Sequence, residues 1–106
     1  IGMPYMELIL EFDFDADVIE VPQYVLENKE ILQKRFLKWL YSGRTRHKYW
    51  VTVRDVDGKK YRGVKYRSDA FVEWLNKKVL MDGMEKASIL EEHVYEYTDD
   101  IPKLVF

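Results

Sequence analysis

The first part of the chain alternates between apolar and polar positions. On one side of the alternation stand Met6, Leu8, Leu10, Phe12 and Phe14, and on the other Glu7, Ile9, Glu11, Asp13 and Asp15. A period of two predicts a half-buried β-strand, because successive side chains of a strand point to opposite faces. The aspartates are then expected on the solvent face of this strand, and residues 18–21 are expected to add a short extended piece.

Three aspartates at alternate positions also resemble the start of a calcium-binding loop. An EF-hand loop that began at Asp13 would need Gly at its sixth position and Glu at its twelfth. The chain has Val18 and Tyr24 at those positions. The sequence therefore predicts no metal site of that type, and no cofactor is expected.

Two later segments show the period of an amphipathic helix. In the first, Val25, Leu32, Phe36, Trp39 and Leu40 fall on one stripe. Because Asn28 is a suitable N-cap, residues 22–27 are expected to form a separate turn and the main helix to begin at Lys29. In the second, Ser68 is expected to cap a helix that runs to about Met81.

The most definite element is a β-hairpin between Lys48 and Tyr66. Two β-rich runs flank Asp55-Val56-Asp57-Gly58, which favours a type I turn with Gly58 in the left-handed conformation. Pairing Asp55 with Lys59 divides the hairpin into two faces. One face holds Tyr49, Val51, Val53 and Tyr61, and the other holds Trp50, Thr52, Arg54, Lys60, Arg62, Val64 and Tyr66.

Residues 89–97 read as a further strand, with a helix as the alternative, and Pro102 separates this segment from a short extended tail. The order βαββαβ predicts an α+β, ferredoxin-like fold, with an antiparallel sheet and two helices on one of its faces. Residues 1–106 are expected to form a single domain. Ile1 and Gly2 precede Met3 and are expected to be an expression remnant, with Met3 or Met6 as the natural start.

Composition and charge narrow the picture. The 106 residues include no Cys, which excludes disulfides and thiol chemistry and fits a reducing, cytoplasmic setting. No apolar run approaches the roughly 18 residues that a membrane span needs, and no signal peptide is recognised. Residues 1–33 carry eight acids and one Lys, residues 34–67 carry twelve Lys or Arg and two Asp, and residues 68–106 carry four Lys and nine acids. A basic middle thus lies between two acidic arms.

The simplest interpretation of this pattern is structural. In a ferredoxin-like sheet the first strand lies beside the third, so Glu7, Glu11 and Asp13 would face Lys60 and Arg62, with Arg54 one strand farther. Each such exposed pair contributes only about 0.2–1 kcal/mol. These pairs would therefore select which strands are neighbours more than they would stabilise the sheet.

A sharper alternative is nucleic-acid binding through residues 42–67. Cations for phosphates and flat rings for bases are what single-strand binders use. The candidate residues are Arg44, Arg46, His47, Lys48, Trp50, Arg54, Lys60, Arg62 and Tyr66. The third-strand motif of RNA-recognition domains is not met, because this chain has Arg62-Gly63-Val64-Lys65-Tyr66 there.

The preferred hypothesis is a protein interface. More apolar side chains stand on the two helices than one core-facing stripe needs, and a small monomer seldom leaves such a surface bare. The candidate anchors are Trp74, Met81, Leu37 and Tyr41. The sequence thus predicts a non-catalytic binding or assembly domain, with a protein partner or a second copy of the chain, compatible with an accessory protein of a bacterium or a phage.

An enzyme is not expected, and no small-molecule substrate is evident. His47 and His93 stand far apart in unlike contexts, and no nucleophile motif or Gly-rich phosphate loop is present. The remaining exception is a small ribonuclease that would use Arg44, Arg46, His47 and Tyr49.

Overall fold

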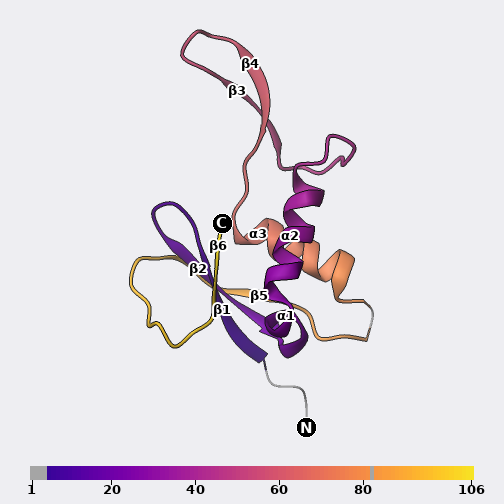
Figure 1. The fold of residues 1–106 in the computed structure, drawn as a ribbon, viewed down its shortest axis with the longest axis vertical. Helices are drawn as coiled ribbons and strands as arrows, with labels where there is room; N and C mark the ends of the chain where they lie inside the picture. Colours follow the sequence, from indigo (N-terminus) through magenta and orange to yellow (C-terminus); the bar gives the residue numbers. More distant parts are fainter. Residues whose placement is uncertain (1–4, 82) are drawn as a thin grey trace.

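The strands of this chain form a four-stranded sheet and a separate two-stranded hairpin (Figure 1). The computed structural model describes residues 5–81 and 83–106, so the expectation for residues 1–2 lies outside it. In chain order the elements are β1 (Tyr5–Glu11), β2 (Ala16–Pro22), α1 (Gln23–Glu27), α2 (Lys29–Leu40), β3 (Trp50–Arg54), β4 (Lys60–Val64), α3 (Ser68–Trp74), the π-helical η1 (Leu75–Val79), β5 (Ser88–Val94) and β6 (Lys103–Val105). The α+β class is confirmed.

The strand order differs from a ferredoxin-like sheet. The larger sheet has the order β5-β2-β1-β6, with β1 antiparallel to β2 and parallel to β6. Among the described strands, β3 and β4 pair only with each other. The reason is local: β1 ends at Glu11, the Phe12 N–H donates to the Asp15 carbonyl at 2.8 Å, and the chain turns back. Strand β2 therefore takes the place beside β1 that a ferredoxin-like order gives to the hairpin.

This turn also overturns the expected position of the acidic side chains. Phe14 lies in the turn and is 91% exposed, instead of facing the core. Asp17 belongs to β2, opposite Leu10, on the same face as Ile19 and Val21. It is therefore buried under the helices. The expected pairing of Glu7, Glu11 and Asp13 with Lys60, Arg62 and Arg54 is wrong. Glu7 and Glu11 lie on β1 and Asp13 in the turn after it, whereas the cations lie on the separate hairpin.

The helices begin close to the predicted positions. Asn28 is the N-cap of α2 and separates it from the short α1, as expected. Ser68 is the first residue of α3 and not its cap, because its hydroxyl donates to Asp17. Among the described residues, no helix combines the length and apolar character that crossing a membrane requires.

The core lies between one face of the larger sheet and the helices, and Phe36 is at its centre. The rings of Trp39, Tyr66, Phe71, Trp74 and Phe106 lie 5.2–6.1 Å from the Phe36 ring. Trp74 is 4% exposed. It therefore packs in the core and does not anchor a surface, because α3 turns that face towards α2.

The hairpin formed by β3 and β4 extends away from this core along the longest axis of the molecule, which measures 56 × 33 × 19 Å overall (Figure 1). Its register is the predicted one: Arg54 lies opposite Lys60, and the Asp55 N–H donates to the Lys59 carbonyl at 3.0 Å. Gly58 has φ of 81°, the left-handed conformation expected for the turn. Within β3 and β4 the two faces are therefore the predicted ones, whereas Tyr49 and Tyr66 lie outside these strands.

Candidate functional site

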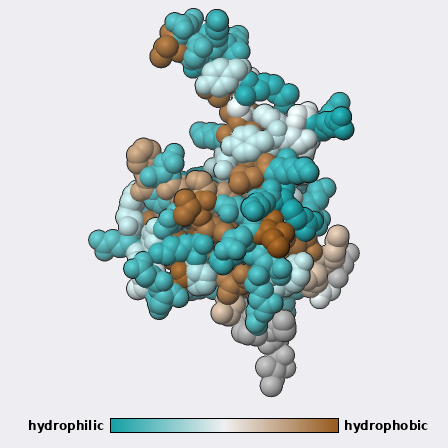
Figure 2. Space-filling view, in the orientation of Figure 1, coloured by the Kyte–Doolittle hydropathy of each residue, from teal (hydrophilic) through white to brown (hydrophobic). Residues whose placement is uncertain are grey.

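One face of the hairpin carries a set of exposed cations. Residues directly opposite each other in an antiparallel pair share a face, so Arg54 and Lys60 stand side by side, and Arg62 follows opposite Thr52. All three cations are exposed. Among the described residues, none of the three forms an ion pair. Figure 2 shows the hairpin as a mostly hydrophilic arm above the body.

The loop before β3 is held in place by His47. Its Nε2 lies 2.7 Å from the Leu40 carbonyl oxygen at the end of α2, and its Nδ1 accepts the Tyr49 N–H at 3.1 Å. Because Nδ1 accepts, Nε2 carries the ring proton and donates. Both ring nitrogens of His47 thus hold the loop in place. Arg44, Arg46 and Lys48 belong to the same loop and are exposed.

A column of flat groups joins the hairpin to the body. The Arg62 guanidinium carbon lies 4.6 Å from the centre of the Trp50 ring. The Trp50 ring is stacked on His47, with centroids 5.5 Å apart and 3° between the planes. His47 in turn lies 4.7 Å from Trp39 on α2. The cationic face of the hairpin is therefore continuous with the surface around Trp39.

Two hollows lie at that end of the body and share Trp39, Thr45 and Lys78. One, of about 600 Å³, also has Arg35 and Lys38 in its wall. The other, of about 620 Å³, is lined by the loop cations and by the lysines of η1. Sequence reasoning missed Arg35, Lys38, Lys77 and Lys78, because only the packing of the helices brings them beside the loop. We call the basic surface the set Arg35, Lys38, Arg44, Arg46, Lys48, Arg54, Lys60, Arg62, Lys77 and Lys78, all of which are exposed.

Glu73 is an acidic side chain that lines the second of these hollows, and its charge is already balanced. Lys77 lies 2.8 Å and Lys48 3.1 Å from its carboxylate, and the Tyr49 hydroxyl donates to it. The hydrogen bonds from Lys77 and Tyr49 lower the pKa of Glu73 to about 2. The carboxylate therefore stays ionised and offsets part of the charge of two lysines. Within residues 5–81 and 83–106, none of the other eight cations forms an ion pair.

The remaining predicted residues are spread over the fold. Tyr66 is half-buried against Phe36, and burial together with Tyr41 raises the pKa of Tyr66 to about 12. Leu37 packs against the core. Tyr41 and Met81 are 58% and 61% exposed, and they follow different helices. A protein interface formed by Leu37, Tyr41 and Met81 remains a prediction.

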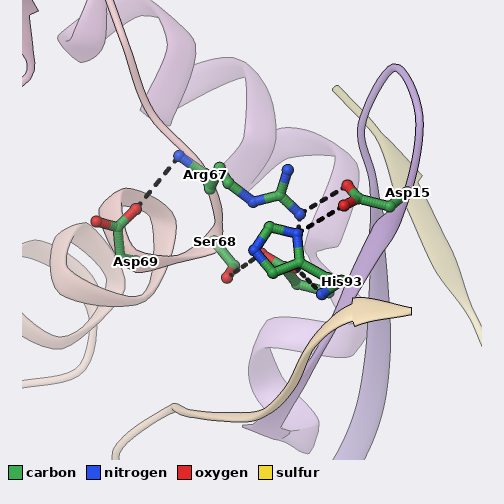
Figure 3. Close-up of polar contacts among 6 residues, drawn as sticks. Asp15, Arg67, Ser68, Asp69 and His93 are labelled. Atoms are coloured by element: carbon green, nitrogen blue, oxygen red, sulfur yellow. Dashed lines mark hydrogen bonds and ion pairs between the residues drawn. The ribbon is translucent and has the colours of Figure 1, made fainter. Parts of the chain in front are cut away.

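A second polar cluster contains Asp15 and Asp17, two of the three aspartates at alternate positions, and Figure 3 shows Asp15 beside Arg67 and His93. Asp17 is 1% exposed and accepts hydrogen bonds from the Arg67 guanidinium at 2.7 Å, the Ser68 hydroxyl at 2.5 Å and the His93 N–H at 3.0 Å. Asp15 accepts from Arg67 at 2.8 Å and lies 2.7 Å from Nδ1 of His93. The cluster thus joins the turn after β1, the start of α3 and the end of β5.

Hydrogen bonding keeps both carboxylates of this cluster ionised. Burial acts to raise the pKa of Asp17, but the bonds from Arg67, Ser68 and the His93 backbone outweigh it and leave that pKa below its usual value. The bonds from His93 and Arg67 likewise lower the pKa of Asp15. Within the described residues, no group of three acidic or histidine side chains is arranged to hold a metal ion. The mutual pairing of these groups indicates an anchor for the stem of the hairpin, since Arg67 follows β4 closely.

Comparison of the chain with family models, with curated proteins and with solved structures gives no match in any of the three.

Proposed function

We propose that this protein binds nucleic acid through the basic surface. The observation that carries the proposal is the alignment of Arg54, Lys60 and Arg62 on one exposed face of a projecting hairpin. Like charges on one small face repel each other, and the acidic strand that was expected to balance them lies in another sheet. The phosphates of a polyanion would supply the missing counter-charge. Each phosphate contact would also release condensed counterions, which favours binding.

The segregation of charge supports the same function despite the net charge of −2. Nine Lys or Arg and two Asp fall between residues 42 and 67. The two aspartates, Asp55 and Asp57, are confined to the turn of the hairpin. The field near the hairpin and loop is therefore positive at distances below the Debye length, which is about 8–10 Å at physiological salt.

A matched pair of substitutions tests the proposal. Lys60 is the first residue of β4, and Lys59 precedes it in the turn, where its backbone N–H donates to the Asp55 carboxylate. Lys60→Gln is expected to weaken binding to a duplex and to reduce the slope of log affinity against log salt by about 1. Lys59→Gln removes the same charge from the turn, beside Asp55, and is expected to change that slope much less.

The measurement is fluorescence anisotropy of labelled nucleic acid, titrated with protein at salt concentrations between about 50 and 200 mM. Binding that falls steeply with salt supports the proposal. Absence of binding at about 50 mM salt, or an affinity that salt does not change, would refute it.

A second candidate function, binding to a protein partner or to a second copy of the chain, is favoured by the opposite face of the hairpin. Val51, Val53 and Tyr61 lie there, and Tyr61 is 53% exposed. A two-stranded hairpin alone is marginally stable in water, so cover over this face would stabilise it. Sedimentation over a range of protein concentrations tests self-association, and a monomer at every concentration would exclude a homodimer.

A further inference from the structure

Recognition of single-stranded nucleic acid relies on flat side chains that are free to stack on bases. The ring of Trp50 is not free. His47 lies parallel to it, the Arg62 guanidinium lies 4.6 Å from its centre, and its Nε1–H donates to the Thr45 carbonyl at 3.0 Å. A base that stacked on this ring would have to displace groups that hold the loop and the hairpin together.

Three of the other aromatic side chains near the basic surface are also engaged. The Trp39 ring, which lines both hollows, lies 6.1 Å from the Phe36 ring and 4.7 Å from the His47 ring. Tyr49 is 6% exposed, and its hydroxyl donates to Glu73. Tyr66 is half-buried, and its ring meets Phe36 edge to face with centroids 5.8 Å apart. Tyr61 is exposed, but it lies on the face of the hairpin that points away from Arg54, Lys60 and Arg62. The basic surface thus presents cations without the rings that a single strand would use.

The spacing of the cations suits rows of phosphates. On the hairpin, residues directly opposite each other are about 5 Å apart, and the next residues on the same face follow after about 7 Å. Arg54, Lys60 and Arg62 therefore start from fixed points on a ribbon about 17 Å long. A duplex keeps its bases stacked inside and exposes two rows of charge, and its major groove, about 12 Å wide in B-DNA, admits a two-stranded ribbon.

We infer that the ligand of the basic surface is double-stranded nucleic acid, held through its phosphates, and that a single strand is the poorer ligand. This inference rests on the proposed function and specifies its substrate. The hairpin supplies one line of cations, and the two hollows around Lys78 supply a second group on the body.

The turn of the hairpin decides which part of it meets the duplex. Asp55 and Asp57 lie at the tip, and the Asp55 carboxylate accepts the backbone N–H groups of Asp57 and Lys59 at 3.0 and 2.9 Å. These carboxylates repel phosphate. The flat cationic face, and not the tip, therefore lies against the duplex.

The experiment compares a labelled DNA duplex with each of its separated strands, and with an RNA duplex of the same sequence, at equal salt. A duplex of about 20 base pairs is about 68 Å long at 3.4 Å per pair, so it exceeds the 56 Å length of the protein. We expect the duplex to bind at least about tenfold more tightly than either strand, with a slope near −0.9 for each phosphate contacted. The RNA duplex shows whether the B-form groove contributes beyond the phosphates.

Two substitutions separate phosphate contact from stacking. Arg62→Gln is expected to weaken duplex binding and to reduce the salt slope by about 1. Tyr61→Ala is expected to change duplex binding less than about twofold, because Tyr61 lies on the other face. Single-strand affinity equal to or above duplex affinity, or a large loss with Tyr61→Ala, would overturn the inference while the proposed function stands. No binding to any of the nucleic acids would overturn both.

Discussion

Asp17 offers the sharpest test of how the hairpin is anchored. The substitution Asp17→Asn keeps the size and shape of the side chain and removes its charge. Its oxygen can still accept from Arg67 and His93, and its amide can donate to the Ser68 hydroxyl, so the fold is retained. In the wild type an ionised carboxylate accepts all three hydrogen bonds. In Asp17→Asn the side chain is neutral, so only the bond with Arg67 still has a charged partner.

The size of the effect follows from these contacts. A hydrogen bond to a charged group contributes about 1.5–3 kcal/mol and one between neutral groups about 0.5–1.5 kcal/mol, so each of three bonds loses about 1 kcal/mol. The loss at Arg67 is smaller, because its side chain is 35% exposed and keeps Asp15. Removing the charge of Asp17 also removes the cost of burying it, which offsets part of this loss of stability. The net loss of unfolding free energy is expected to be about 2 kcal/mol, which lowers Tm by about 8–10 °C in a domain of this size.

The assay is thermal and urea unfolding of the wild type, Asp17→Asn and the control Asp13→Asn. Asp13 stands in the same turn region and is exposed, so its substitution is expected to change stability by less than about 0.5 kcal/mol.

The pH dependence gives a second measurement on the same proteins. Because the pKa of Asp17 is lowered in the folded state, its contribution is present above the unfolded pKa of about 3.9 and is lost as pH falls through the folded pKa. The difference between wild type and Asp17→Asn should therefore be largest near neutral pH and shrink in acid. Equal stability of Asp17→Asn and Asp13→Asn, or a difference that grows in acid, would refute the anchor.

Three further substitutions test other parts of the structure. Phe36→Ala is expected to cost about 3–5 kcal/mol of unfolding free energy in urea, because Phe36 is fully buried at the centre of the aromatic core; a loss below about 1 kcal/mol would contradict that packing. Tyr49→Phe removes a donor to Glu73; NMR titration should show the pKa of Glu73 rise from about 2 towards its ordinary value, and no change would show that the bond is absent in solution. Gly58→Ala places a side chain where φ is 81° in open space; the expected loss of about 1 kcal/mol comes from backbone strain alone, and hydrogen exchange of the hairpin amides should report it.

Part of the candidate site could be predicted from the sequence because it depends on neighbouring residues. Alternation along β3 and β4 places Arg54, Lys60 and Arg62 on one face once the turn at Asp55 and Gly58 sets the register. The loop cations follow directly before β3. The contribution of Lys77 and Lys78 could not be predicted, since they stand about thirty residues from the loop and within an acidic part of the sequence.

Two predictions failed where a local pattern was compatible with more than one partner. The alternation from Met6 to Phe14 is that of one long strand, but a backbone bond between Phe12 and Asp15 reverses the chain. That reversal changes the neighbour of β1 and leaves the hairpin outside the sheet. Trp74 was expected on the surface because it lies off the main stripe of its helix, yet Phe36 and Phe71 pack against it.

The sequence by itself determined the hairpin, its register and two faces, the start of α2 at Lys29 and the separation of charge along the chain. These features depend on turn geometry, capping and side-chain periodicity, which act over a few residues. Only the tertiary structure decided which strands share a sheet, that Asp17 is buried against Arg67, and that the hairpin cations have no acidic partner in the part of the chain that the structure describes. Those outcomes depend on which distant segments meet, and opposite charges exposed to water attract each other too weakly to select that arrangement.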